Sequence, residues 1–167
     1  MKQLSLFALL LLSLASCTIR FDRAPKNTLN EFPEEFKGRY LFSNRKELDS
    51  TYVTITKNSI SFSDNKILQS GGLSDSMKLA KGAKYYFLCS RGIQNNKTVW
   101  DVYPIKFKGK HLMIFALDAE YYKKSIKKYF KPIEGFEDLY VMDDKQLDKF
   151  CKKKLKNKSA IKLKRLE

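Results

Sequence analysis

Hydrophobic and polar residues alternate along much of the chain, with the two-residue period of half-buried β-strands. Residues 51–57 and 59–64 both follow this pattern, and a two-residue turn at positions 57 and 58 would pair Ile55 with Ile60. The apolar side chains of both segments then lie on one face of the sheet, so burial and turn length favour the same register. The pattern predicts a β-hairpin.

Other segments show the same alternation less completely. Residues 36–42 are interpreted as the first strand of the sheet, and residues 84–91 as a later one with apolar side chains on both faces. The pattern of residues 66–69 favours a short strand. The stretch 70–75 contains two adjacent glycines among polar residues, and it predicts a loop.

The clearest hairpin is predicted for residues 98–107 and 111–117, in the register that pairs Ile105 with Leu112. Apolar residues occupy both faces of these two segments. A sheet that is apolar on both sides must be covered on both sides. Pro104 has no N–H to donate, so its strand is expected to lie at an edge or to carry a bulge at that position.

Helical periodicity is found towards the C-terminus. Residues 118–131 carry one apolar stripe opposite a lysine-rich surface, with Asp118 placed to cap the helix. After a short strand at 139–142, residues 144–155 repeat this arrangement behind Asp143. We therefore predict an α+β fold, in which a curled antiparallel sheet of about six to eight strands is covered by two C-terminal amphipathic helices.

The start of the chain has a different character. Residues 4–14 form an almost unbroken apolar run, which is shorter than the roughly 20 residues that cross a bilayer and is typical of a secretory signal peptide. The tetrapeptide that closes it, Leu14-Ala15-Ser16-Cys17, resembles the lipobox of bacterial lipoproteins. This resemblance implies that the signal peptide is removed and that Cys17 carries acyl chains such as palmitate. The alternative is an ordinary signal peptide followed by a chance cysteine.

This interpretation divides the chain into three parts. Residues 1–16 are the signal peptide, residues 17–31 the lipidated cysteine with a flexible tether, and residues 32–167 one globular domain with a basic C-terminal tail. The tether is expected because its residues are polar and interrupted by Pro25, and a flexible chain of that length spans about 20 Å. The tail, residues 156–167, alternates only faintly, and the sequence leaves open whether it docks as a strand or frays.

Charge narrows the choice of partners. The formal net charge is +15, and residues 145–167 contain ten Lys or Arg against two acidic residues. For a secreted protein, anionic lipid, lipopolysaccharide or an acidic envelope protein is the expected partner, and nucleic acid is not. The alternative is that the lysines only solvate the helices. The residues expected to contact an anionic surface are Lys123, Lys124, Lys127, Lys128, Lys152, Lys153 and Lys154.

Little in the sequence indicates catalysis. Cys89 and Cys151 either form a disulfide in an oxidising envelope or are buried as free thiols. The one histidine, His111, would face Lys106 across the predicted hairpin and is interpreted as a solvated strand residue. No Cys or His spacing is typical of a zinc site, and no nucleotide-binding motif is found. We expect neither a cofactor, nor a metal, nor enzymatic activity.

These observations favour a membrane-anchored, non-enzymatic cell-envelope lipoprotein that binds or scaffolds through a basic surface. Thr18, and not aspartate, follows the cysteine. By the same resemblance, this implies a lipid anchor in the outer membrane, facing the periplasm.

A first alternative rests on residues 36–40, whose Gly-x-aromatic pattern resembles the first strand of lipocalin-like barrels and implies a carrier of a small hydrophobic ligand. A second is an immunity or inhibitor protein against an envelope toxin, whose target would be acidic.

Overall fold

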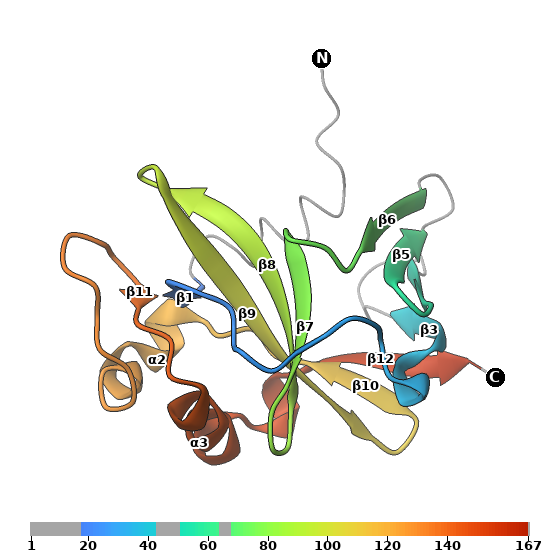
Figure 1. Ribbon diagram of the computed structural model, residues 1–167. Helices are drawn as coiled ribbons and strands as arrows, with labels where there is room; N and C mark the ends of the chain where they lie inside the picture. Colours follow the sequence, from blue (N-terminus) through green and yellow to red (C-terminus); the bar gives the residue numbers. More distant parts are fainter. Residues whose placement is uncertain (1–17, 43–50, 64–67, 167) are drawn as a thin grey trace.

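The computed structural model describes residues 18–42, 51–63 and 68–166, and one strongly curled sheet dominates it (Figure 1). The strands are β1 (Arg20–Phe21), β2 (Thr28–Leu29), β3 (Gly38–Phe42), β4 (Thr51–Ile55), β5 (Ser59–Ser63), β6 (Leu68–Gly72), β7 (Met77–Lys81), β8 (Tyr86–Gln94), β9 (Lys97–Lys108), β10 (His111–Ile114), β11 (Leu139–Tyr140) and β12 (Ile161–Leu166). The helices are α2 (Ala119–Ile126), α3 (Asp144–Lys154) and the short 3-10 turns η1 (Glu34–Phe36) and η2 (Asn157–Ser159).

The tail is the strand that joins the two halves of the sheet. Pairing follows the order β2-β7-β8-β9-β10-β12-β3-β4-β5-β6, so β12 lies between the meander β3–β6 and the meander β7–β10. The predicted α+β class and curled sheet are confirmed. The described residues form twelve strands and not six to eight, because β1, β2, β7 and the tail strand β12, which the sequence did not predict, also pair with the sheet.

Two predicted hairpins have different outcomes. The β4–β5 hairpin has the expected register, with Ile55 paired to Ile60. In the β9–β10 hairpin the expected register is wrong by two residues, because Ile105 pairs with Ile114 and not with Leu112. The turn begins at Gly109, whose φ of 59° suits glycine. A shift of two residues leaves every side chain on its expected face, so the hydrophobic pattern is the same in both registers.

The predicted loop at residues 70–75 is also wrong in part. Residues 70–72 continue β6, where Gly71 pairs with Ile60 and Gly72 with Ser59. Two glycines provide no alternating side chains for a pattern to detect, yet their backbone groups pair with β5 like those of any other residue.

Strand β9 changes neighbour at Pro104. The N–H of Phe115 donates to the carbonyl of Pro104 at 2.9 Å, and the pairing with β10 stops next to it at Ile105. Further along the same edge, β1 takes over and pairs Arg20 with Asp101. Pro104 therefore lies where one ladder ends, as its missing N–H predicts.

Both faces of the central strands are buried, as predicted. On one face Phe87 and Val102 lie in a core beneath the two α-helices. On the other face Ile105 and Leu112 are enclosed by the curl of the sheet and by Phe36, which comes from the segment before β3. The helices thus cover one face, and the chain that enters β3 helps to cover the second.

The two helices begin where the sequence predicts. Asp118 accepts a hydrogen bond from the N–H of Tyr121 at 2.8 Å, and Asp143 accepts one from Gln146 at 3.0 Å. Helix α2 ends at Ile126, earlier than predicted, and turns carry the chain onward. In the described part of the chain, neither helix has the length and apolar character needed to cross a bilayer.

The expected tether is wrong over the residues that the structure describes. Ile19 and Phe21 are both 0% exposed, and β1 pairs with β9 on one side and β11 on the other. The ring of Phe21 packs edge-on against Phe130, with centroids 5.1 Å apart. The folded domain therefore includes residues 18–31. The signal peptide and Cys17 lie outside the described residues.

Replacing Phe21 with alanine tests this packing. The change should lower the free energy of unfolding by about 3–5 kcal/mol, because it empties a fully buried aromatic site. Lys26→Ala, in the same segment but exposed, should change it by less than about 0.5 kcal/mol. Urea denaturation of the purified variants measures both values, and equal midpoints would show that the segment is a tether after all.

Candidate functional site

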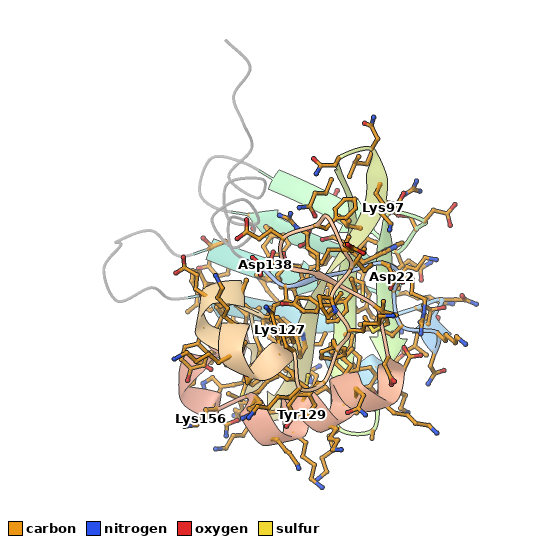
Figure 2. The ribbon with its side chains drawn as sticks, turned by 90° about the vertical axis from the view of Figure 1, so that its left-hand side faces the viewer. Asp22, Lys97, Lys127, Tyr129, Asp138 and Lys156 are labelled. Carbon is orange, nitrogen blue, oxygen red and sulfur yellow. The ribbon has the colours of Figure 1, made fainter. Side chains whose placement is uncertain are left out.

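The two α-helices form one layer over the sheet, and Figure 2 views this layer face on. Phe150 of α3 is fully buried and is the centre of their contact. Its ring centroid lies 5.1 Å from that of Tyr122, 5.4 Å from Tyr129 and 6.0 Å from Phe130. These edge-on contacts hold the helices together through their apolar sides and leave their opposite sides to solvent.

Helix α3 is held on the sheet by polar contacts that use an acidic side chain. The carboxylate of Asp148 accepts the N–H of Ala83, with both oxygens at 3.1 Å. The approach is close, since an added Cβ at Gly82 would lie 2.4 Å from Asp148 Oδ1. Tyr85 also donates to the carbonyl of Cys151 at 3.4 Å. One of the few acidic residues of α3 is therefore directed towards the sheet.

The lysines of both helices lie on the outer surface of the layer. Residues 145, 149, 152 and 153 share one stripe of α3, opposite the buried stripe that contains Phe150. Lys154 falls on the buried side of the helix and is only half-exposed, so its predicted surface role is the weakest of the set. We define the basic face as the exposed residues Lys123, Lys124, Lys127, Lys128, Lys145, Lys149, Lys152 and Lys153.

The positive charge of the basic face is not offset by ion pairs in the described part of the chain. The neighbouring acids are used elsewhere: Asp118 and Asp143 cap the helices, and Asp144 pairs with Arg23 at 3.2 Å. The sequence prediction omitted Lys145 and Lys149, although the helical stripe of Lys152 and Lys153 already includes their positions.

The first described residue is fixed at one end of this layer. Thr18 is 5% exposed and forms a β-bridge with Asp118, the cap of α2. Its hydroxyl donates to Asp101 Oδ1 at 3.0 Å, and the N–H of Ile19 donates to Leu117 at 2.8 Å. Thr18, which follows the candidate lipidation site Cys17 in the sequence, therefore lies beside the N-terminal end of α2.

The two remaining cysteines do not form a disulfide. Cys89 and Cys151 are both 0% exposed, and both thiols are free. The disulfide alternative is corrected, and the thiols belong to the core beneath the helices. Burial raises the pKa of each thiol well above its usual value, so neither forms the reactive thiolate near neutral pH.

The structure gives His111 and Lys106 different neighbours from those that the sequence predicted. His111 is exposed at the start of β10 and pairs in register with Lys108 and Lys164, which corrects the expected pairing with Lys106. Lys106 instead lies with Nζ 5.0 Å from the ring centroid of Tyr85, and desolvation, followed by repulsion from neighbouring lysines, lowers its pKa. Among the described residues, no group of three potential metal ligands comes together.

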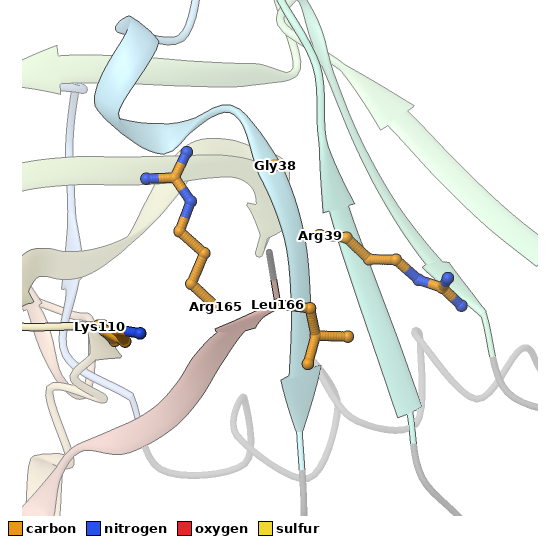
Figure 3. Close-up of a pocket in the computed structure, with 5 residues that line it drawn as sticks. All are labelled: Gly38, Arg39, Lys110, Arg165 and Leu166. Carbon is orange, nitrogen blue, oxygen red and sulfur yellow. The ribbon is translucent and has the colours of Figure 1, made fainter.

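A hollow of about 340 Å³ lies beside β3 and β12, and three of its five lining residues are basic (Figure 3). The side chains do not converge: Arg165 and Arg39 lie on opposite sides of β3. Arg165 donates to the carbonyls of Glu35 and Lys37, and the Arg39 guanidinium stacks 4.2 Å from the ring centroid of Tyr52. Both guanidinium groups are engaged within the protein, so the hollow does not form an anion site.

The concave side of the sheet is filled by aromatic side chains in the described part of the chain. Phe36 and Tyr40 are 0% exposed, and the ring of Phe107 lies 5.0 Å from Phe36. The hydroxyl of Tyr40 donates to the carbonyl of Phe36 at 2.7 Å. These groups occupy the region where a lipocalin-like carrier would hold its ligand.

Comparison with protein-family models, curated proteins and solved structures finds no match to this chain. The protein is therefore described by its own structure: a curled sheet covered on one face by a lysine-rich helical layer.

Alkylation of a Cys17→Ser variant tests the state of the two core thiols. Without reductant, the folded protein should gain no alkyl groups and the denatured protein should gain two, as measured by intact mass. Reductant should change neither result. A denatured protein that reacts only after reduction would show a disulfide between Cys89 and Cys151.

Proposed function

We propose that this protein is a non-enzymatic lipoprotein of the bacterial cell envelope, held at the membrane by acyl chains on Cys17 and binding an anionic partner through its basic face. The proposed location is the outer membrane, on its periplasmic side. The resemblance of residues 14–17 to a lipobox supports the anchor. The observation that supports the binding role is the basic face itself, whose lysines are exposed without ion pairs in the described part of the chain.

The arrangement of charge favours a binding surface over simple solvation. A solvated helix commonly carries acids and bases interspersed, so that its surface field is weak. Here Asp118, Asp143, Asp144 and Asp148 are used in caps and internal contacts, so that Glu120 is the one exposed acid left within α2, and the basic-face lysines of both helices remain on one side. Near an anionic membrane each such lysine contributes about 1 kcal/mol.

Changing Cys17 to serine tests the anchor. Cells that express the wild type and are fed labelled palmitate should yield a labelled protein in the membrane fraction, whereas Cys17→Ser should be unlabelled and leave that fraction. The thiol is the proposed acyl acceptor, and serine does not replace it in this chemistry. An unlabelled wild-type protein would exclude the lipoprotein assignment.

Charge reversal tests the basic face, in the Cys17→Ser background so that the anchor does not contribute. Changing Lys123, Lys124, Lys127 and Lys128 together to Glu should weaken binding to anionic vesicles on the order of a thousandfold at low salt, since four lysines each lose about 1 kcal/mol and every 1.4 kcal/mol is tenfold.

The matched control reverses four exposed lysines outside the helices. Changing Lys57, Lys97, Lys108 and Lys164 to Glu alters the net charge equally and should weaken binding less. Equal losses in the two variants would show that net charge, and not the basic face, determines binding.

A further inference from the structure

We propose that the basic face docks on anionic lipid headgroups of the same bilayer that holds the anchor, so that the protein lies on its own membrane in one orientation. This inference rests on the proposed lipid anchor and adds the partner and the geometry. Four observations carry it: the missing spacer, the short range of electrostatic attraction, the contacts that fix the N-terminal segment on the helices, and an exposed tyrosine beside the attachment point.

The missing spacer brings the folded body to the membrane. Cys17 is bonded to Thr18, and consecutive Cα atoms are about 3.8 Å apart. Thr18 itself is buried and paired with Asp118. A flexible tether through residue 31 would instead have spanned about 20 Å. The acyl chains are thus attached at the surface of the body, next to the first turn of α2.

The attraction between lysines and anionic headgroups acts over a short distance, so the length of the attachment determines whether the basic face experiences it. Screening reduces the attraction between exposed charges beyond about 10 Å at moderate salt. A body on a long tether would spend most of its time with its lysines outside that range. A body attached at Thr18 holds α2 within it, and the exposed lysines of α2 begin only five residues after its cap.

Hydrogen bonds hold the N-terminal segment against the helical layer. The N–H of Met142 donates to Asp22 Oδ1 at 2.8 Å, and Arg23 donates to the carbonyl of Met142 at 3.1 Å. The ion pair of Arg23 with Asp144 then joins the same segment to the start of α3. The N-terminal segment is therefore bound to both helices of the layer, and the two helices keep a fixed position relative to the anchor.

An exposed aromatic side chain lies at the right place for the lipid interface. Tyr121 is in the first turn of α2 and is 67% exposed, which is unusual for so large a side chain. Its ring packs edge-on against Tyr122, with centroids 4.7 Å apart, and so is held away from the core. Tyrosine favours the headgroup region of a bilayer, where its ring and its hydroxyl are both accommodated.

Site-directed fluorescence on the full-length, lipidated protein tests the orientation. The probe is placed at Glu120→Cys, beside the attachment point, or at Asn58→Cys, in the β4–β5 turn on the side of the molecule away from the helices (Figure 1). Both positions are exposed, while Cys89 and Cys151 are buried and should not react. The protein is reconstituted in phosphatidylcholine vesicles with or without phosphatidylglycerol, which carry a quencher on their headgroups.

With phosphatidylglycerol present, the probe at position 120 should be quenched several-fold more strongly than the probe at position 58. Equal quenching of the two probes would overturn the docking inference. Flotation with pure phosphatidylcholine vesicles and intact mass measure the anchor separately. Loss of flotation together with a mass that lacks acyl groups would therefore reject the proposed function itself.

A spacer variant separates docking on the protein's own bilayer from binding of a free anion or a protein. Inserting a Gly-Ser spacer of about 20 residues between Cys17 and Thr18 allows a separation of roughly 25 Å. Quenching at position 120 should then become much more sensitive to salt. If the spacer leaves the salt dependence unchanged, the short attachment does not direct the face to the membrane and the inference fails.

Discussion

Burial of Ile19 and Phe21 is the contact on which the functional interpretation depends. These two side chains insert a short strand between β9 and β11 and bring the start of the folded chain to the cap of α2. Without that packing, the residue next to Cys17 could lie anywhere within the reach of a flexible segment. With it, Thr18 is fixed at the end of the helical layer.

The second constraint is the sheet that is apolar on both faces. The central strands need cover on each side, and the helices provide it on one side by packing around Phe150. A helix that covers a core with its apolar stripe must present its other side to solvent. Asp118 and Asp143 cap the helices and Asp148 holds α3 on the sheet, which leaves the lysines in excess over the exposed Glu120 on the basic face.

Burial determines the chemistry of the two thiols beneath this layer. The two thiols are buried and their pKa values are raised, and His111 lies on the surface between lysines. Aromatic rings occupy the concave side of the sheet in the described part of the chain.

The sequence by itself determined what short-range patterns can specify: the β4–β5 hairpin and its register, both helix starts, and a sheet that needs two covers. Only the tertiary structure decided which segments complete the sheet. Residues 19–21 are too few to show a period, the tail alternates faintly, and the β9–β10 hairpin has the same pattern in two registers. In each case the deciding contacts come from residues distant along the chain, such as Phe130 for Phe21 and β3 for β12, and local patterns contain no information about them.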